Sequence, residues 1–161
     1  MTSLSSRGRL FVAAATLAAG LLCLAVVMIP VAEVGGLPAA PWFRLALRPA
    51  CHQISDRCLD LGSGPLAVCA RCAGLYAGGF LGLLVTAVGG RRLHPSWKIV
   101  ALAAAPSIID FVLGQLGLPS LTNWPRFSLA TVPGLLLGFL LGDAISTLTR
   151  KATEPSDGSM A

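Results

Sequence analysis

The sequence predicts an all-α, polytopic membrane protein with four transmembrane helices and an extramembrane Cys/His loop between the first two. Of its 161 residues, 55% are hydrophobic and 12% are charged, with a mean hydropathy of +0.77. That composition is too apolar for an ordinary soluble domain. Four apolar segments also reach the roughly 20 residues that cross a hydrocarbon core, and in lipid such segments are helical. The expected helices are residues 10–34, 65–90, 97–118 and 127–148, with the loop at 35–68, in a single domain of residues 1–148.

The first apolar segment follows Arg7 and Arg9, as the apolar core of a signal peptide would. It is longer than the roughly 7–15 residues of a signal peptide core, so we expect an uncleaved membrane anchor. After it, Trp42, Arg44 and Arg48 lie in a stretch where apolar and basic residues alternate. This pattern indicates a short amphipathic helix in the membrane interface, and an irregular connector is the alternative.

The second and fourth apolar segments each carry three glycines at intervals of four. Small residues at this spacing let two helix backbones approach closely, which is the main source of affinity between helices in lipid. We therefore expect a direct contact between these two helices. The glycines are Gly74, Gly78 and Gly82 in one segment and Gly134, Gly138 and Gly142 in the other.

The third apolar segment contains an acid, Asp110. A charge at that depth costs at least about 2.5 kcal/mol unless it is paired, protonated or hydrated, and such residues usually mark a functional site. Arg71 is the preferred partner and Arg126 the second choice. Asp143 lies near the other end of the fourth segment, where Arg150 or Lys151 can neutralise it. The expected polar cluster consists of Arg57, Arg71, Tyr76, Asp110, Gln115, Asn123 and Arg126.

Basic residues set the expected orientation. Seven of them cluster at helix ends on one side, and five lie on the other side. The positive-inside rule then predicts a cell-membrane protein with both termini in the cytoplasm and the Cys/His loop outside. The basic residues form no stripe with interleaved aromatics, which argues against a nucleic-acid partner and leaves the lipid bilayer as the expected one. The polar tail, residues 149–161, is expected to be disordered.

Four of the five cysteines fall within the loop and the start of the second segment: Cys51, Cys58, Cys69 and Cys72. Cys69 and Cys72 are three apart, and we expect both in the first turns of a helix, whose positive dipole end favours thiolates. With Cys51 or the adjacent His52, and with Cys58, they supply enough sulfur and nitrogen ligands for a tetrahedral transition-metal site, of which zinc is the most typical occupant.

Other functions remain open on the same residues. The pairs Cys51–Cys58 and Cys69–Cys72 on a four-helix scaffold resemble, in general plan, a quinone-linked membrane thiol–disulfide oxidoreductase. A loop held by disulfides or by a purely structural ion is a third reading. A transporter or assembly factor, with Asp110 on an ion path, is a fourth. Covalent haem is excluded, because no His follows the second Cys of the CxxC pair.

The residues CHQ (Cys51–Gln53), Arg57 and VCARCAGLYAG (Val68–Gly78) resemble a prokaryotic membrane-protein family catalogued as domain of unknown function 2085. The resemblance extends to Asp110, Gln115, Asn123, Arg126 and Gly134. It implies a multi-spanning membrane fold and no established activity. Cys58 stands where the family motif has Ser, and Phe111 stands where Gly is usual. The shared set is then Cys51, His52, Cys69 and Cys72, which suits a metal better than two disulfides.

Overall fold

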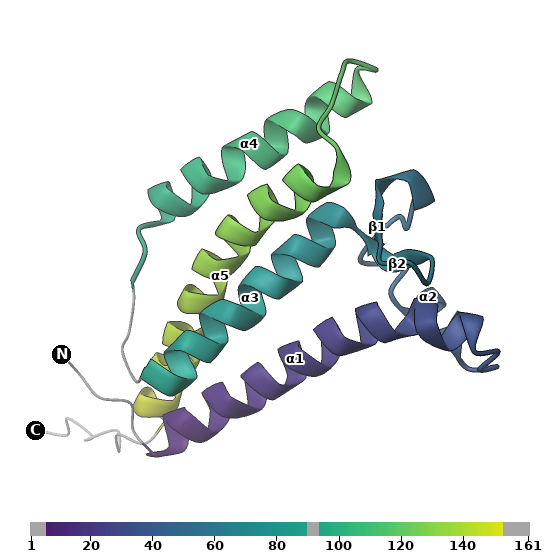
Figure 1. Ribbon diagram of the computed structural model, residues 1–161. Coiled ribbons are helices and arrows are strands. Elements are labelled where there is room, and N and C mark those ends of the chain that lie inside the picture. Colours follow the sequence, from purple (N-terminus) through teal and green to yellow (C-terminus); the bar gives the residue numbers. More distant parts are fainter. Residues whose placement is uncertain (1–5, 90–93, 153–161) are drawn as a thin grey trace, which may run out of the picture.

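Four long helices form the body of the protein in the computed structural model, which describes residues 6–89 and 94–152. All four are long and apolar enough to cross a membrane, which confirms the predicted architecture. Arg91, Arg92 and residues 153–161, part of the basic set and of the expected tail, lie outside the described residues. The helices are α1 (Ser6–Val34), α3 (Ala70–Gly89), α4 (Trp97–Gln115) and α5 (Asn123–Lys151) (Figure 1).

A small sheet replaces the expected start of the second helix. Residues Pro65–Cys69 form strand β2, which pairs antiparallel with β1 (Cys58–Asp60), so α3 begins only at Ala70. The hairpin turns through Gly62 and Gly64, both at positive φ. The Asp60 carboxylate accepts hydrogen bonds from their N–H groups at 2.7 and 3.3 Å. The expectation of helix from residue 65 was wrong because this turn sends the chain back as a strand.

The contact between α3 and α5 is as close as the glycine spacing predicts. A Cβ atom added to Gly78 would lie 2.7 Å from the backbone nitrogen of Leu135 and would also collide with Thr131. The reverse holds from α5, where Gly134 lies against the backbone of Leu75. The predicted direct packing of these two helices is therefore confirmed.

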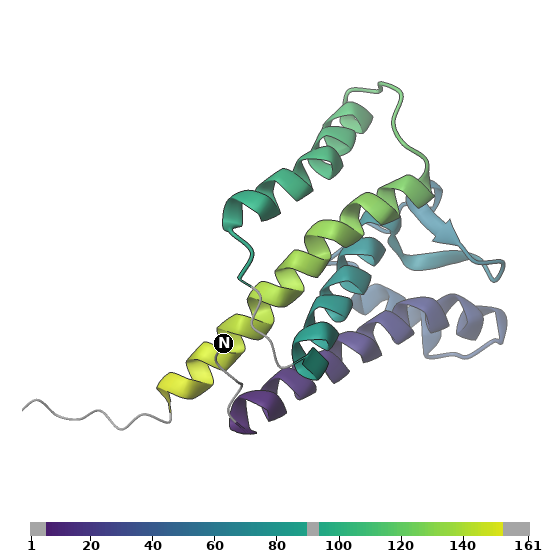
Figure 2. The same ribbon diagram turned by 60° about the vertical axis from the view of Figure 1, so that its left-hand side comes forward.

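Helix α4 lies on the outer side of α5, and α1 lies on the opposite side of α3 (Figures 1 and 2). Asp110 is the buried residue of α4. Just before α4 begins, His94 Nδ1 lies 3.1 Å from the Asp143 carboxylate of α5. The expected neutralisation of Asp143 by Arg150 or Lys151 was wrong: among the described residues it is His94, not either of these two, that contacts the carboxylate.

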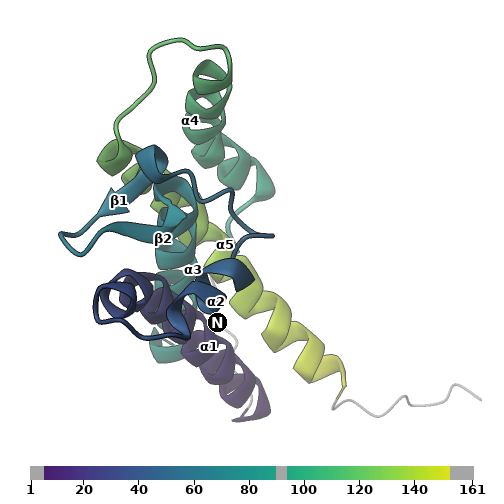
Figure 3. The same cartoon turned by 90° about the vertical axis from the view of Figure 1, so that its right-hand side faces the viewer.

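The loop elements gather at the end of the bundle where α1 ends and α3 and α5 begin; Figure 3 views the molecule from that side. They are α2 (Ala40–Ala46), the 3₁₀ turn η1 (Ser55–Arg57) and the two strands. Arg44 of α2 bonds both carboxylate oxygens of Glu33 at 2.7 and 2.8 Å and the Pro65 carbonyl oxygen at 3.1 Å. One side chain thus ties together the end of α1, α2 and β2.

Candidate metal centre

The sulfur atoms of Cys51, Cys69 and Cys72 lie within 4.8 Å of one another. A tetrahedral zinc ion with Zn–S bonds of about 2.3 Å would separate its sulfur ligands by about 3.8 Å. The sulfur–sulfur separations in the structure therefore exceed that distance by no more than about 1 Å. Cys51 is buried, and the other two are half-buried. We call these three residues the thiol cluster.

The cluster forms at the junction of β2 and α3. Cys69 is the last residue of the strand, and Cys72 lies in the first turn of the helix. The first N–H groups of a helix have no partner within the helix, and here those of Arg71 and Cys72 bond the Cys69 sulfur. The N–H of Cys69 in turn donates to Cys51 Sγ at 3.1 Å. The backbone therefore supports negative charge on these sulfurs.

The pKa values of Cys69 and Cys58 are shifted in opposite directions by their surroundings. A hydrogen bond from the Cys72 thiol, with the backbone N–H groups, lowers the pKa of Cys69 to about 5. Burial raises the pKa of Cys58 to about 11, and its thiol donates to the Ile54 carbonyl oxygen at 3.2 Å. Since the thiolate is the metal-binding form, Cys69 has the character of a ligand and Cys58 has that of a packed, neutral thiol.

His52 is exposed and lies outside the thiol cluster, although it follows Cys51 directly. The next residue, Gln53, has φ +54°. A non-glycine residue with positive φ is uncommon, and such residues are concentrated at functional sites. The Gln53 side chain holds this conformation by donating to the Arg44 carbonyl oxygen at 2.7 Å. No sequence pattern predicts the positive φ at Gln53.

A second group of polar residues lies beside the cluster and reaches into the bundle. The Asp110 carboxylate of α4 binds the Arg71 guanidinium of α3 and accepts from Arg126 Nε of α5 at 3.1 Å. It also accepts from the Leu121 N–H at 2.7 Å. Arg126 donates further to Ser120 Oγ at 2.6 Å. Three helices therefore meet at one carboxylate.

Asn123 extends this group towards the loop. Its amide donates to the carbonyl oxygens of Asp56 and Cys58 at 3.0 and 2.8 Å, and its oxygen lies 3.4 Å from Arg126 Nη1. The residues that the structure brings together are Arg71, Asp110, Asn123 and Arg126, with Ser120 and the Leu121 N–H, which sequence reasoning missed. We call this set the polar cluster.

Three residues expected in the polar cluster lie elsewhere. Gln115 is exposed at the end of α4. The Arg57 side chain makes no hydrogen bond to any of the residues that the structure describes, although its N–H donates to the Ile54 carbonyl oxygen at 2.9 Å. Tyr76 points from α3 into an apolar cavity between α1 and α5.

Fold and site together define a membrane protein with four candidate spans, a three-thiol cluster at one end and a buried carboxylate–arginine cluster beside it. The chain belongs to the family described as "Predicted membrane protein (DUF2085)", whose model matches residues 51–142. That range contains every residue of both clusters.

The chain is also similar to an uncharacterised protein of Methanocaldococcus jannaschii, with 28% identity over 93 residues. The match covers 55% of this chain and 56% of the relative, so the chain spans about half the length of that protein. No solved structure matches the chain significantly.

Proposed function

We propose that this protein binds one transition-metal ion, zinc, through Cys51, Cys69 and Cys72 at the extracytoplasmic surface of the cell membrane. The observation that carries the proposal is the mutual approach of three sulfurs within 4.8 Å, contributed by two separate parts of the chain, the loop after α2 and the β2–α3 junction. Thiolate sulfur is a preferred zinc ligand, and closed sites of this kind hold chain segments together. A metal here would fasten the loop after α2 to the junction of β2 and α3.

We assign the fourth ligand position to His52. Its imidazole is exposed and makes no hydrogen bond to the described residues, so nothing holds it away from the cluster. Three sulfurs and one nitrogen make a common structural zinc set. Adjacent ligands are geometrically demanding, so the turn at Gln53 has to adjust when His52 binds. Cys58 has no part in the proposed site.

The polar cluster complements the proposed metal site. Three thiolates with a divalent ion leave one negative charge, whereas one carboxylate between two guanidiniums leaves one positive charge. Arg71 connects the two, because its N–H bonds the Cys69 sulfur and its guanidinium binds Asp110. In this proposal the metal fixes the position of the start of α3. The ion pair of Arg71 with Asp110 then fixes α4 relative to α3.

A membrane thiol–disulfide oxidoreductase is the second candidate. Its support is the Cys69–Cys72 pair, with a Cys69 pKa lowered to about 5 by the Cys72 hydrogen bond, as redox-active CxxC cysteines require. The second pair that this mechanism needs is Cys51–Cys58. The neutral, buried Cys58, bonded to the Ile54 carbonyl, argues against it. We therefore place the metal site first.

The test is metal analysis of the purified full-length protein, with free thiols counted on the same sample. We expect about one zinc ion per chain. Cys69→Ser and Cys72→Ser should abolish binding, His52→Ala should weaken it, and Cys58→Ser should leave it unchanged. Metal-free protein with two disulfides and no effect of His52→Ala would contradict the proposal and support the oxidoreductase.

A further inference from the structure

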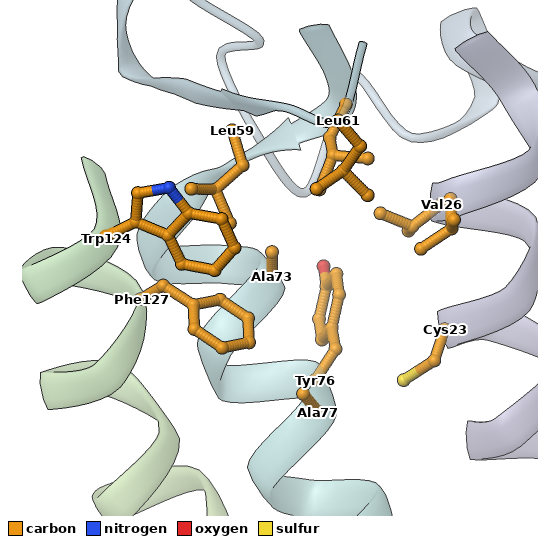
Figure 4. A pocket seen from close by; sticks show the side chains of 11 residues that line it. Cys23, Val26, Leu59, Leu61, Ala73, Tyr76, Ala77, Trp124 and Phe127 are labelled. Carbon is orange, nitrogen blue, oxygen red and sulfur yellow. The ribbon is translucent and has the colours of Figure 1, made fainter. Parts of the chain in front are cut away.

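A cavity of about 200 Å³ lies between α1, α3 and α5, directly beneath the sheet (Figure 4). Its walls are almost entirely carbon, from side chains such as Val26 of α1, Leu59 of β1 and Phe127 of α5. An engineered apolar cavity of about 150 Å³ stays dry and binds benzene. The present cavity therefore has room for one ring-sized molecule with a substituent.

The Tyr76 hydroxyl is presented to this cavity. Figure 4 shows the ring rising from α3 between Phe127 and Cys23, with its oxygen towards the strands. Within the described part of the chain the hydroxyl makes no hydrogen bond. Tyr76 is half-buried, and tyrosine hydroxyls in apolar surroundings usually find a hydrogen-bond partner. A water molecule needs two to four polar partners, so a single hydroxyl in a carbon-lined space does not hold one.

Aromatic side chains make up one side of the cavity. Trp124 and Phe127 pack edge to face with ring centroids 6.1 Å apart, and Tyr76 lies across from them. Ring faces and edges offer a bound ring favourable contacts beyond simple area burial. Trp124 is 59% exposed and Leu61 51% exposed, so the cavity has its rim at the surface beside these residues. A tryptophan at this height is typical of the membrane interface.

We propose that this cavity binds a small, neutral ring compound with one hydrogen-bonding group, such as a phenol or a cyclic ketone, taken up from the membrane interface. The ring packs against Phe127 and Trp124, and its polar group bonds the Tyr76 hydroxyl. An acyl chain would fill the space but leave that hydroxyl unpaired. No residue of the thiol cluster lines the cavity, although the cavity and the thiol cluster share one apolar core.

Fluorescence quenching of Trp124 tests this site in the full-length protein. Trp42→Phe and Trp97→Phe, both at exposed positions, leave Trp124 as the single tryptophan of the three. The probes are 4-bromophenol, bromobenzene and 1-bromooctane, whose bromine quenches a nearby indole. We expect saturable quenching by both ring compounds, tighter for 4-bromophenol. Tyr76→Phe should weaken 4-bromophenol roughly threefold to tenfold, the value of one net hydrogen bond, and leave bromobenzene unchanged.

A cavity-filling variant supplies the steric control. Ala77→Leu places a larger side chain at the cavity wall and should abolish saturable binding of both rings. Ala101→Leu makes the same change at an exposed position of α4 and should have no effect. The proposal is overturned by non-saturable quenching, or by 1-bromooctane binding as well as bromobenzene. An unchanged 4-bromophenol affinity in Tyr76→Phe also overturns it, since that variant removes only an unpaired oxygen and leaves folding intact.

Discussion

Arg71 of α3 and Asp110 of α4 form an ion pair inside the helical bundle, and Arg126 of α5 binds the same carboxylate oxygen. Asp110 is the buried residue of α4, so its carboxylate attaches the loop end of α4 to α3 and α5. At the other end His94 lies 3.1 Å from Asp143. Helix α4 is therefore joined to α5 by an ion pair at the loop end, and the segment just before α4 contacts α5 through His94.

Asp110→Asn should destabilise the protein more than Arg71→Ala does. The first change leaves two guanidiniums without their carboxylate, whereas the second leaves Asp110 paired with Arg126. Removing one partner of a buried pair typically costs about 3–5 kcal/mol. The measurement is unfolding of the purified variants in detergent by a denaturant series. Equal stability of Arg71→Ala and wild type, or a milder effect of Asp110→Asn, would disprove the shared-carboxylate account.

Gly78→Ala should destabilise the α3–α5 contact, and Gly79→Ala should not. The added methyl at Gly78 collides with the α5 backbone, whereas at Gly79 the nearest atom is 3.9 Å away. Overpacking of a close contact typically costs about 1–3 kcal/mol. Thermal unfolding of the two variants, which differ by one position, reports the difference. Indistinguishable melting temperatures would mean that the helices do not pack through this face.

The main features of the fold could be predicted from residue patterns. Length and hydropathy predict four spans, and the glycine spacing predicts which two helices pack together. The β2 strand could not be predicted, because Pro65–Cys69 is as apolar as the helix that follows it. Its conformation depends on the turn at Gly62 and Gly64 and on pairing with β1, and neither leaves a periodic signal.

The candidate site could be predicted only in part. The cysteines and Asp110 stand out because reactive sulfur and a charge are rare in apolar sequence. The Glu33–Arg44 pair and the Ser120 contact were missed, because each joins residues across a loop and follows no local spacing. Tyr76 was expected in the polar cluster. The structure places it instead at the cavity between α1 and α5.

The two cysteines Cys69 and Cys58 should differ sharply in alkylation. A pKa lowered to about 5 means that Cys69 stays a thiolate as the pH falls and loses reactivity only near that value. A pKa raised to about 11 keeps Cys58 protonated through neutral pH. Metal-free, reduced protein treated with iodoacetamide between pH 4 and pH 9 and mapped by mass spectrometry shows which site reacts. Faster labelling of Cys58 than of Cys69 at pH 6 would contradict the assignment.

The proposed orientation predicts which end of the bundle faces outward. In a variant with all five native cysteines replaced, Ser55→Cys places a thiol at an exposed loop position and Ala152→Cys places one just after α5. A membrane-impermeant maleimide applied to intact cells should label Ser55→Cys. Ala152→Cys should be labelled only after the membrane is broken. The reverse pattern would show that the thiol cluster faces the cytoplasm.

Cobalt substitution tests the metal site most directly. Co²⁺ takes the place of zinc in thiolate sites, and its spectrum reports both sulfur ligation and tetrahedral geometry. Titration of the reduced, metal-free protein should give a sulfur-to-cobalt charge-transfer band that saturates at about one ion per chain. The band should be lost in Cys51→Ser, Cys69→Ser and Cys72→Ser and retained in Cys58→Ser. Absence of that band from the reduced wild-type protein, or its presence undiminished in Cys69→Ser, would contradict the account.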